Sequence, residues 1–308
     1  MWFKNLRLYL LQQPFNLTSE ALENRLQQKR FQPCASHDVQ AYGWYEPLGR
    51  QGELLVHEMI GCQMICARQE EKLLPSTVVN EIVEDKASAM ESEAGRKLGR
   101  KERSELKEEV FQQLLPKAFS RFSRQFAMID KQQGWILVDA ASANKAEALI
   151  SLLRETLGSL PVKPLEVRLA PSFVMTEWLR QPNRHAGFEL LDSCELKERT
   201  EEPGVVRCKG QDLTAEEMIA HLDAGKDVVK LAVSWDERLS FQIESDMSIK
   251  RLRFLDLIQD EAADYQTENA ADAFDAHFSL MLLEFRRLIP RLLELFGGAV
   301  MESDEDKK

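Results

Sequence analysis

The chain has few cysteines and no long apolar run. Its 308 residues include five cysteines, an odd number without the spacing of a disulfide framework, which is typical of a reducing cytosol. No stretch approaches the roughly 18 consecutive apolar residues of a membrane span. The first residues, MWFKNLRLYLLQQPF, are interrupted by Lys4 and Arg7 and lack a small-residue cleavage site, so they do not resemble a secretion signal. We therefore expect a soluble, cytoplasmic protein that does not enter membranes.

An excess of positive charge is also absent. The chain carries 40 Lys and Arg against 51 Asp and Glu, a net charge of -11. This balance counts against nucleic-acid binding, because phosphate neutralisation requires clustered cations. The local field matters more than the sum, however. Acidic residues concentrate at 81–93, 189–202, 256–275 and the C-terminus, whereas basic residues are in excess at 96–103, 117–131 and 205–211. An acidic exterior with a basic inner surface is compatible with this pattern.

The familiar catalytic motifs are missing. The sequence contains no phosphate-binding loop, no G-x-G-x-x-G, no H-E-x-x-H and no G-x-S-x-G. His57, Cys62 and Cys66 are the best candidates for a zinc site. Two cysteines four positions apart in a strand lie about 13 Å apart, too far to share one ion. We interpret both cysteines as core residues and expect neither a metal nor a cofactor.

One enzymatic alternative stays open. Glu70 and Lys72 match the E-x-K half of a metal-dependent nuclease site, in which carboxylates hold Mg²⁺ and a lysine assists the water. The match covers two residues, and no partner aspartate is evident at the end of a preceding strand. We expect a protein that is not an enzyme, with a Mg²⁺-dependent nuclease as the alternative.

Apolar periodicity predicts an α+β fold with antiparallel sheets. Strands are expected at 2–11 and at 54–67, the second interrupted by a turn or bulge at Gly61, and a hairpin at 126–130 and 135–139. Helices are expected from Thr18 or Ser19 to Arg30, at 143–157, after a cap at Asp212 or Thr214, and at 274–298 with a kink or restart at Pro290.

The boundaries between the predicted parts follow from composition. The pattern of residues 76–115 predicts two helices joined by a basic connection that contains Gly95 and Gly99. This helical hairpin is too polar to belong to a core, and we interpret it as a projecting arm. We expect a central α+β domain from 1–75 and 116–165, this helical arm as a tip, a second α+β domain at 166–300, and a disordered acidic tail at 301–308.

Two stretches could bind nucleic acid. The stretch LLPKAFSRFSRQF places Phe119, Phe122 and Phe126 among cations, as a base-stacking platform, a core face or a contact between subunits would. The stretch CKGQDLT places Lys209, Gly210 and Gln211 before a helix N-terminus, where backbone N–H groups favour an anion. Lys226 and Lys230 follow that helix. The alternative for the second stretch is an ordinary capped helix with a polar loop.

Several stretches together resemble one family over nearly the full length of the chain, the recombination-associated protein RdgC of proteobacteria. They occur in the family's order and at comparable distances: WFKNL, ICARQEEKLLPS, LLPKAFSRFS, ASANKAEALISLLRETLGSLPV, TEWLR, GFELLD, QDLTAEE and AGKDVVKLA. The resemblance implies a DNA-binding protein without enzymatic activity. It also implies a ring-shaped homodimer that encircles duplex DNA with little sequence preference, associates with the nucleoid and restrains RecA-type recombinase.

The resemblance also implies roles for particular residues. Phe119 corresponds to a contact between subunits, while Phe122 and Phe126 are expected on the core side. The expected DNA-binding residues are Lys117, Arg121, Arg124, Lys209, Gln211, Lys226 and Lys230, with the arm helping to close the ring. Gly210 stands where relatives often carry a second cation. The expected partner is double-stranded DNA, with single-stranded DNA left open, and the remaining rival is an acidic adaptor that binds proteins and not DNA.

Overall fold

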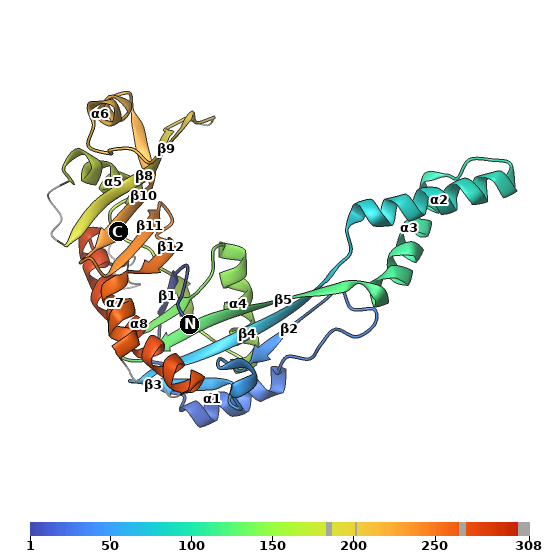
Figure 1. Ribbon diagram of the computed structural model, residues 1–308, viewed down its shortest axis with the longest axis horizontal. Helices are drawn as coiled ribbons and strands as arrows, with labels where there is room; N and C mark the ends of the chain where they lie inside the picture. Colours follow the sequence, from blue (N-terminus) through green and yellow to red (C-terminus); the bar gives the residue numbers. More distant parts are fainter. Residues whose placement is uncertain (183–186, 201, 265–268, 301–308) are drawn as a thin grey trace.

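The computed structural model describes residues 1–182, 187–200, 202–264 and 269–300, and over these residues the chain is a mixed α/β protein (Figure 1). It contains two antiparallel sheets and, in the described residues, eight α-helices. The predicted acidic tail, 301–308, lies outside the described residues. No helix in the described ranges has the length and apolarity to cross a bilayer.

The first sheet has seven strands in the order β2-β4-β5-β6-β1-β7, with β3 also paired to β4. Their bounds are β1 Arg7–Leu11, β2 Gln40–Tyr45, β3 Val56–Met59, β4 Cys62–Leu73, β5 Phe119–Asp130, β6 Trp135–Val138 and β7 Val162–Pro164. The predicted turn at Gly61 is confirmed, since its φ of +74° joins β3 to β4 in a conformation that glycine adopts at little cost.

Both faces of this sheet are covered near its centre. Ile65 and Ala67 pack in one cluster with α1 (Ser19–Leu26) and α4 (Ala143–Leu157). Met64 and Cys66 alternate with them and pack on the other side, in the cluster that includes α8 (Ala270–Leu295). Because successive side chains of a strand point to opposite faces, the run from Cys62 to Ala67 is buried throughout.

The second sheet has five strands in the order β12-β11-β10-β8-β9. Their bounds are β8 Phe188–Glu198, β9 Val205–Lys209, β10 Lys226–Trp235, β11 Leu239–Glu244 and β12 Ile249–Phe254. The remaining helices beside it are α5 Pro171–Arg180, α6 Glu216–Asp223 and α7 Asp256–Asp264.

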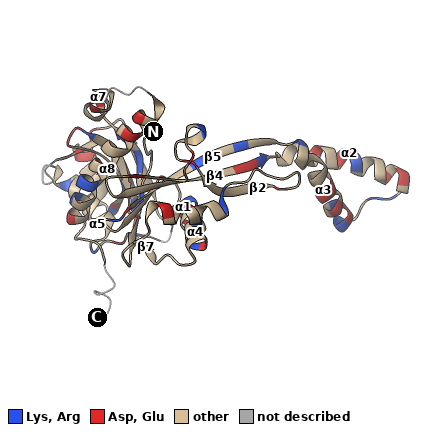
Figure 2. Cartoon of the chain, turned by 90° about the horizontal axis from the view of Figure 1, so that it is seen from below, with Lys and Arg blue, Asp and Glu red and all other residues tan. Residues whose placement is uncertain are grey.

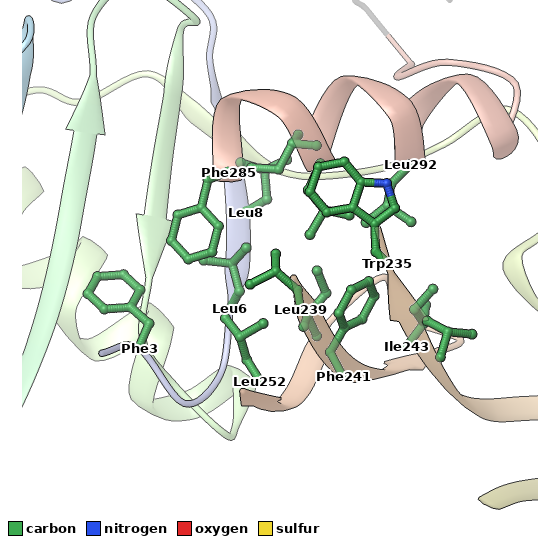
Figure 3. Close-up of a cluster of buried hydrophobic side chains, with 14 of the residues drawn as sticks. Phe3, Leu6, Leu8, Trp235, Leu239, Phe241, Ile243, Leu252, Phe285 and Leu292 are labelled. Atoms are coloured by element: carbon green, nitrogen blue, oxygen red, sulfur yellow. The ribbon is translucent and has the colours of Figure 1, made fainter. Parts of the chain in front are cut away.

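One apolar cluster joins the two sheets. Figure 3 shows Trp235, Leu239 and Phe241 of the second sheet facing Phe285 and Leu292 of α8, with Phe3, Leu6 and Leu8 of the N-terminal segment beside them. Leu6 also exchanges two backbone hydrogen bonds with Ile249. Pro290 lies inside α8, which continues past it to Leu295. The N-terminal segment and α8 therefore hold the sheets together.

The two helices predicted for residues 76–115 are present as α2 (Ser76–Ala94) and α3 (Arg100–Leu114). They pack through a small cluster of their own, with Val79, Val83 and Leu106 among its members. Figure 1 shows them at the outer end of β4 and β5, far from the second sheet. Both helices carry acidic and basic side chains (Figure 2). Their stability therefore depends on each other more than on the rest of the chain.

The structure corrects several predicted boundaries. The first strand begins at Arg7 and not at residue 2, and β4 continues past Ala67 to Leu73. β5 begins at Phe119, seven residues before the predicted strand, because its outer half pairs with β4 from Leu73↔Phe119 onward. The first helix ends at Leu26 and is followed by a short 3₁₀ turn that reaches Lys29. The helix that follows CKGQDLT begins only at Glu216, with Ala215 as its N-cap. Asp212 instead accepts hydrogen bonds from the backbone N–H and hydroxyl of Thr214, which form a local turn and not a helix cap.

Candidate nucleic-acid interface

The second sheet has one covered and one open face. Val228, Leu231 and Val233 of β10 are buried in the apolar cluster that includes α8. Figure 1 shows α5, α7 and α8 on the outer side of this sheet, away from the α2–α3 end of the molecule. The opposite face carries charged side chains, among them Lys230, which lies across from Glu195 of β8. This open face is the strongest candidate for contact with a polyanion.

Basic residues gather in a hollow on this face. The hollow has a volume of about 300 Å³, and its lining residues are Ser193, Cys194, Glu195, Arg207, Cys208, Lys209, Lys230, Gln242 and Arg251. Two of the predicted residues, Lys209 and Lys230, are thus brought together although they are 21 positions apart in the sequence. Arg207 and Arg251 were not predicted. Arg207 has a signal in the sequence, since it stands two positions before Lys209 in one strand and shares its face.

One buried carboxylate organises part of this cluster. The Glu195 side chain accepts a hydrogen bond of 2.9 Å from Nε of Arg207 and lies 3.4 Å from Nζ of Lys230. Burial favours the neutral acid, but the neighbouring Arg207 and Lys230 cations lower the pKa of Glu195 below its ordinary value. Lys226, also predicted to bind DNA, lies opposite Glu198, roughly 10 Å farther along the sheet. Because Glu198 is three β8 positions from Glu195, Lys226 projects from the other face and does not line the hollow. It forms a salt bridge of 2.9 Å with Glu198.

Two cations at the rim of the hollow have no carboxylate partner among the described residues. Within the described ranges, neither Lys209 nor Arg251 has a carboxylate oxygen within 4.0 Å, and both side chains are exposed. Gly210 has a φ of +65° with no atom near its Cβ position, and Gln211 is exposed beside it. The predicted role for a helix N-terminus is wrong here, because Glu216 and Glu217 occupy the first turn of α6 and repel anions.

The predicted residues of β5 do not form one surface. Arg121 lies opposite Glu71, with 2.5 Å between Nη2 and the carboxylate, whereas Arg124 lies opposite Arg68. An odd number of positions separates Arg121 from Arg124, so they project from opposite faces of the sheet. Lys117 is exposed in the 3₁₀ turn that precedes β5. Arg121 and Arg124 therefore cannot contact one ligand from the same face of β5.

The three phenylalanines of β5 have three different environments. Phe126 is buried, as predicted, and Phe119 is 84% exposed. Phe122 is 50% exposed, so the prediction that it belongs to the core is wrong. The core ends at Phe126 because α8, which covers this face at the inner end of the sheet, does not reach the outer half of the β4–β5 ribbon (Figure 1). Phe119 lies directly across from Leu73, which is also exposed.

Glu70 and Lys72 do share a face of β4, as the nuclease alternative requires. Glu70 is buried, however, and accepts 2.6 Å and 2.8 Å hydrogen bonds from the Ser120 hydroxyl and the Cys34 backbone N–H. These two donors lower the pKa of Glu70. Among the described residues, no group of three His, Cys, Asp or Glu side chains could hold a metal ion.

The zinc candidates have structural roles. Cys62 and Cys66 are fully buried in the core, as predicted. Burial raises the pKa of Cys66 to about 12, so its thiol stays protonated at neutral pH. His57 pairs with Asp275 of α8, with 2.7 Å between Nε2 and Oδ1.

The comparison with known proteins agrees with the resemblance seen in the sequence. Residues 1–299 match the family model described as "Putative exonuclease, RdgC". The chain belongs to the RdgC family. The recombination-associated protein RdgC of Aeromonas hydrophila is 46% identical over 298 residues, which cover 97% of this chain and 98% of the relative. The RdgC proteins of Pseudomonas aeruginosa (46% over 299 residues) and Yersinia pestis (45% over 298 residues) match with the same coverage.

Proposed function

We propose that this chain binds duplex DNA through its phosphates, without sequence preference, and thereby modulates RecA-dependent recombination and replication fork repair at the nucleoid. The observation that carries the proposal is the basic hollow on the second sheet, where Lys209 and Arg251 lack carboxylate partners within the described residues of a chain whose net charge is -11. The hollow contains two lysines and two arginines on an open face, which suits contacts with the phosphate backbone and not base reading in a groove.

The proposed assembly is a homodimeric ring. Figure 1 shows the α6 end of the second sheet and the α2–α3 end both extending to the same side of the central strands. A second copy that joined these ends would enclose DNA, with the open face of the second sheet lining the inside. The exposed pair of Phe119 and Leu73, at the base of α2 and α3, supplies apolar surface for such a contact.

The salt dependence of duplex binding tests the proposed function. We expect fluorescence anisotropy without metal to give an observed association constant that falls linearly with salt on a logarithmic plot, with equal slopes for unrelated sequences. Each phosphate contact adds about 0.9 to the slope. Absence of binding at low salt would contradict the proposal and favour the adaptor. Parallel reactions with Mg²⁺ are expected to leave the duplex uncut.

Phe119→Ser tests the subunit contact. The exposed ring is expected to leave solvent only on dimerisation, so the substitution removes apolar burial from the dimer and not from the monomer. We expect the dimer dissociation constant, from sedimentation equilibrium, to rise about tenfold or more, with an unchanged urea midpoint for the monomer. Phe126→Leu is the matched control, since it changes the core while leaving this surface intact. Unchanged dimerisation of Phe119→Ser would exclude the contact.

A further inference from the structure

A second hollow with basic residues lies on the first sheet, at the outer part of β4 and β5. Its volume is about 490 Å³. The lining residues are Tyr45, Leu48, Gly49, Arg50, Gln51, Arg68, Phe122, Ser123 and Arg124. It shares no residue with the basic hollow of the second sheet. We refer to it as the arginine pocket, after Arg50, Arg68 and Arg124.

The positive charges of the arginine pocket repel one another and so destabilise the fold. Arg68 and Arg124 stand directly opposite each other on paired antiparallel strands, an arrangement of like charges that destabilises a sheet. Across the part of the chain that the structure describes, none of the three arginines has a carboxylate within 4.0 Å. Nearby Glu46 is bound by Arg30, and Glu70 is occupied by Ser120 and Cys34. The pocket therefore concentrates positive charge without an internal counter-ion.

Aromatic rings hold one guanidinium group in place. The Cζ atom of Arg68 lies 4.6 Å from the ring centroid of Tyr45 and 4.5 Å from that of Phe122. Phe31 contributes a third ring at 5.1 Å. Cation–π contacts fix the orientation of an arginine while leaving its N–H donors available. A preorganised donor set loses less conformational freedom when an anion binds.

We propose that the arginine pocket binds a nucleotide by its terminal phosphate. A phosphomonoester carries close to two negative charges at neutral pH and three acceptor oxygens, and it therefore suits a cluster of three guanidinium groups better than a singly charged phosphodiester does. The half-exposed ring of Phe122 offers a surface for the base. The volume lies within the range of sites for small ligands.

The nucleotide can come from a DNA strand end or from free solution, and the chemistry of recognition is the same. The strand-end source rests on the proposed DNA binding, whereas the free source does not. The arginine pocket lies on a different sheet from the basic hollow that contains Lys209, so substitutions can impair either site without changing the other.

The experiment compares ligands that differ in one phosphate. A short labelled DNA hairpin with a 5′-phosphate is compared with the same hairpin carrying a 5′-hydroxyl, and thymidine 5′-monophosphate is titrated alone against thymidine. We expect the wild-type chain to bind each phosphorylated ligand at least about tenfold more tightly. Arg68→Gln and Arg124→Gln are each expected to abolish this preference. Lys131→Gln is the control that retains it, since this lysine lies in the turn after β5, outside the arginine pocket, and pairs with Glu58.

The outcomes separate the alternatives. Equal affinities for phosphorylated and hydroxyl ligands in the wild-type chain would overturn the proposal. Closed circular duplex has no strand ends. If Arg68→Gln weakened binding to this duplex as much as binding to the phosphorylated hairpin, the arginine pocket would contact the DNA backbone instead. If the variant no longer dimerised, the pocket would be a contact between subunits. Arg50→Gln, on an exposed turn, keeps the test valid if a strand variant does not fold. Binding of thymidine 5′-monophosphate without duplex binding would uphold this site while excluding the proposed function.

Discussion

The double variant Lys209→Gln/Arg251→Gln is expected to bind duplex DNA about 60-fold more weakly at 0.1 M salt. Each phosphate contact contributes a factor of about eight at this concentration through counterion release, and two contacts multiply. The slope of the logarithmic salt plot should fall by about 1.8. All sequences should be affected alike, because neither residue is expected to read bases. Anisotropy titrations on two unrelated duplexes measure both quantities.

The design of this test depends on the missing ion pairs. Lys209 and Arg251 have no carboxylate within 4.0 Å in the described residues, so neither substitution strands a buried acid as removal of Arg207 would. The control, Arg25→Gln/Lys29→Gln, makes the same change in net charge on and beside α1, below the central sheet in Figure 1. Similar losses in both variants would mean that total charge, and not this surface, determines binding.

Arg286→Ala is expected to lower the free energy of unfolding by about 3–5 kcal/mol, because it leaves a buried carboxylate without its cation. Asp130 is fully buried, and its two oxygens lie 2.7 Å and 3.0 Å from Nε and Nη2 of Arg286. Nη2 also donates to the carbonyl of Ile60. This ion pair connects α8 to the first sheet. Urea denaturation of wild type and variant measures the difference.

The matched control is Arg291→Ala, on the same helix, whose partner Glu294 is exposed. Its removal should cost about 0–1 kcal/mol. A loss of similar size in both variants would contradict a special role for the buried pair.

Local patterns were enough to predict α2, α3, the turn at Gly61 and the buried cysteines. Helix periodicity and capping glycines act within a few residues, so α2 ends where Gly95 adopts a left-handed conformation. The outer half of β5 could not be predicted this way. Phe119, Phe122 and Arg124 are all exposed there, and the strand exists because it pairs with β4.

The sequence by itself determined the family resemblance, the absence of familiar catalytic motifs and the presence of local basic stretches in an acidic chain. Only the tertiary structure decided which cations share a surface. It placed Arg121 against Glu71 and Arg124 against Arg68, and it brought Arg251 beside Lys209. Strand register and sheet order depend on contacts between residues far apart in the chain. Local periodicity does not encode these contacts, because each strand alone specifies its two faces but not its neighbours.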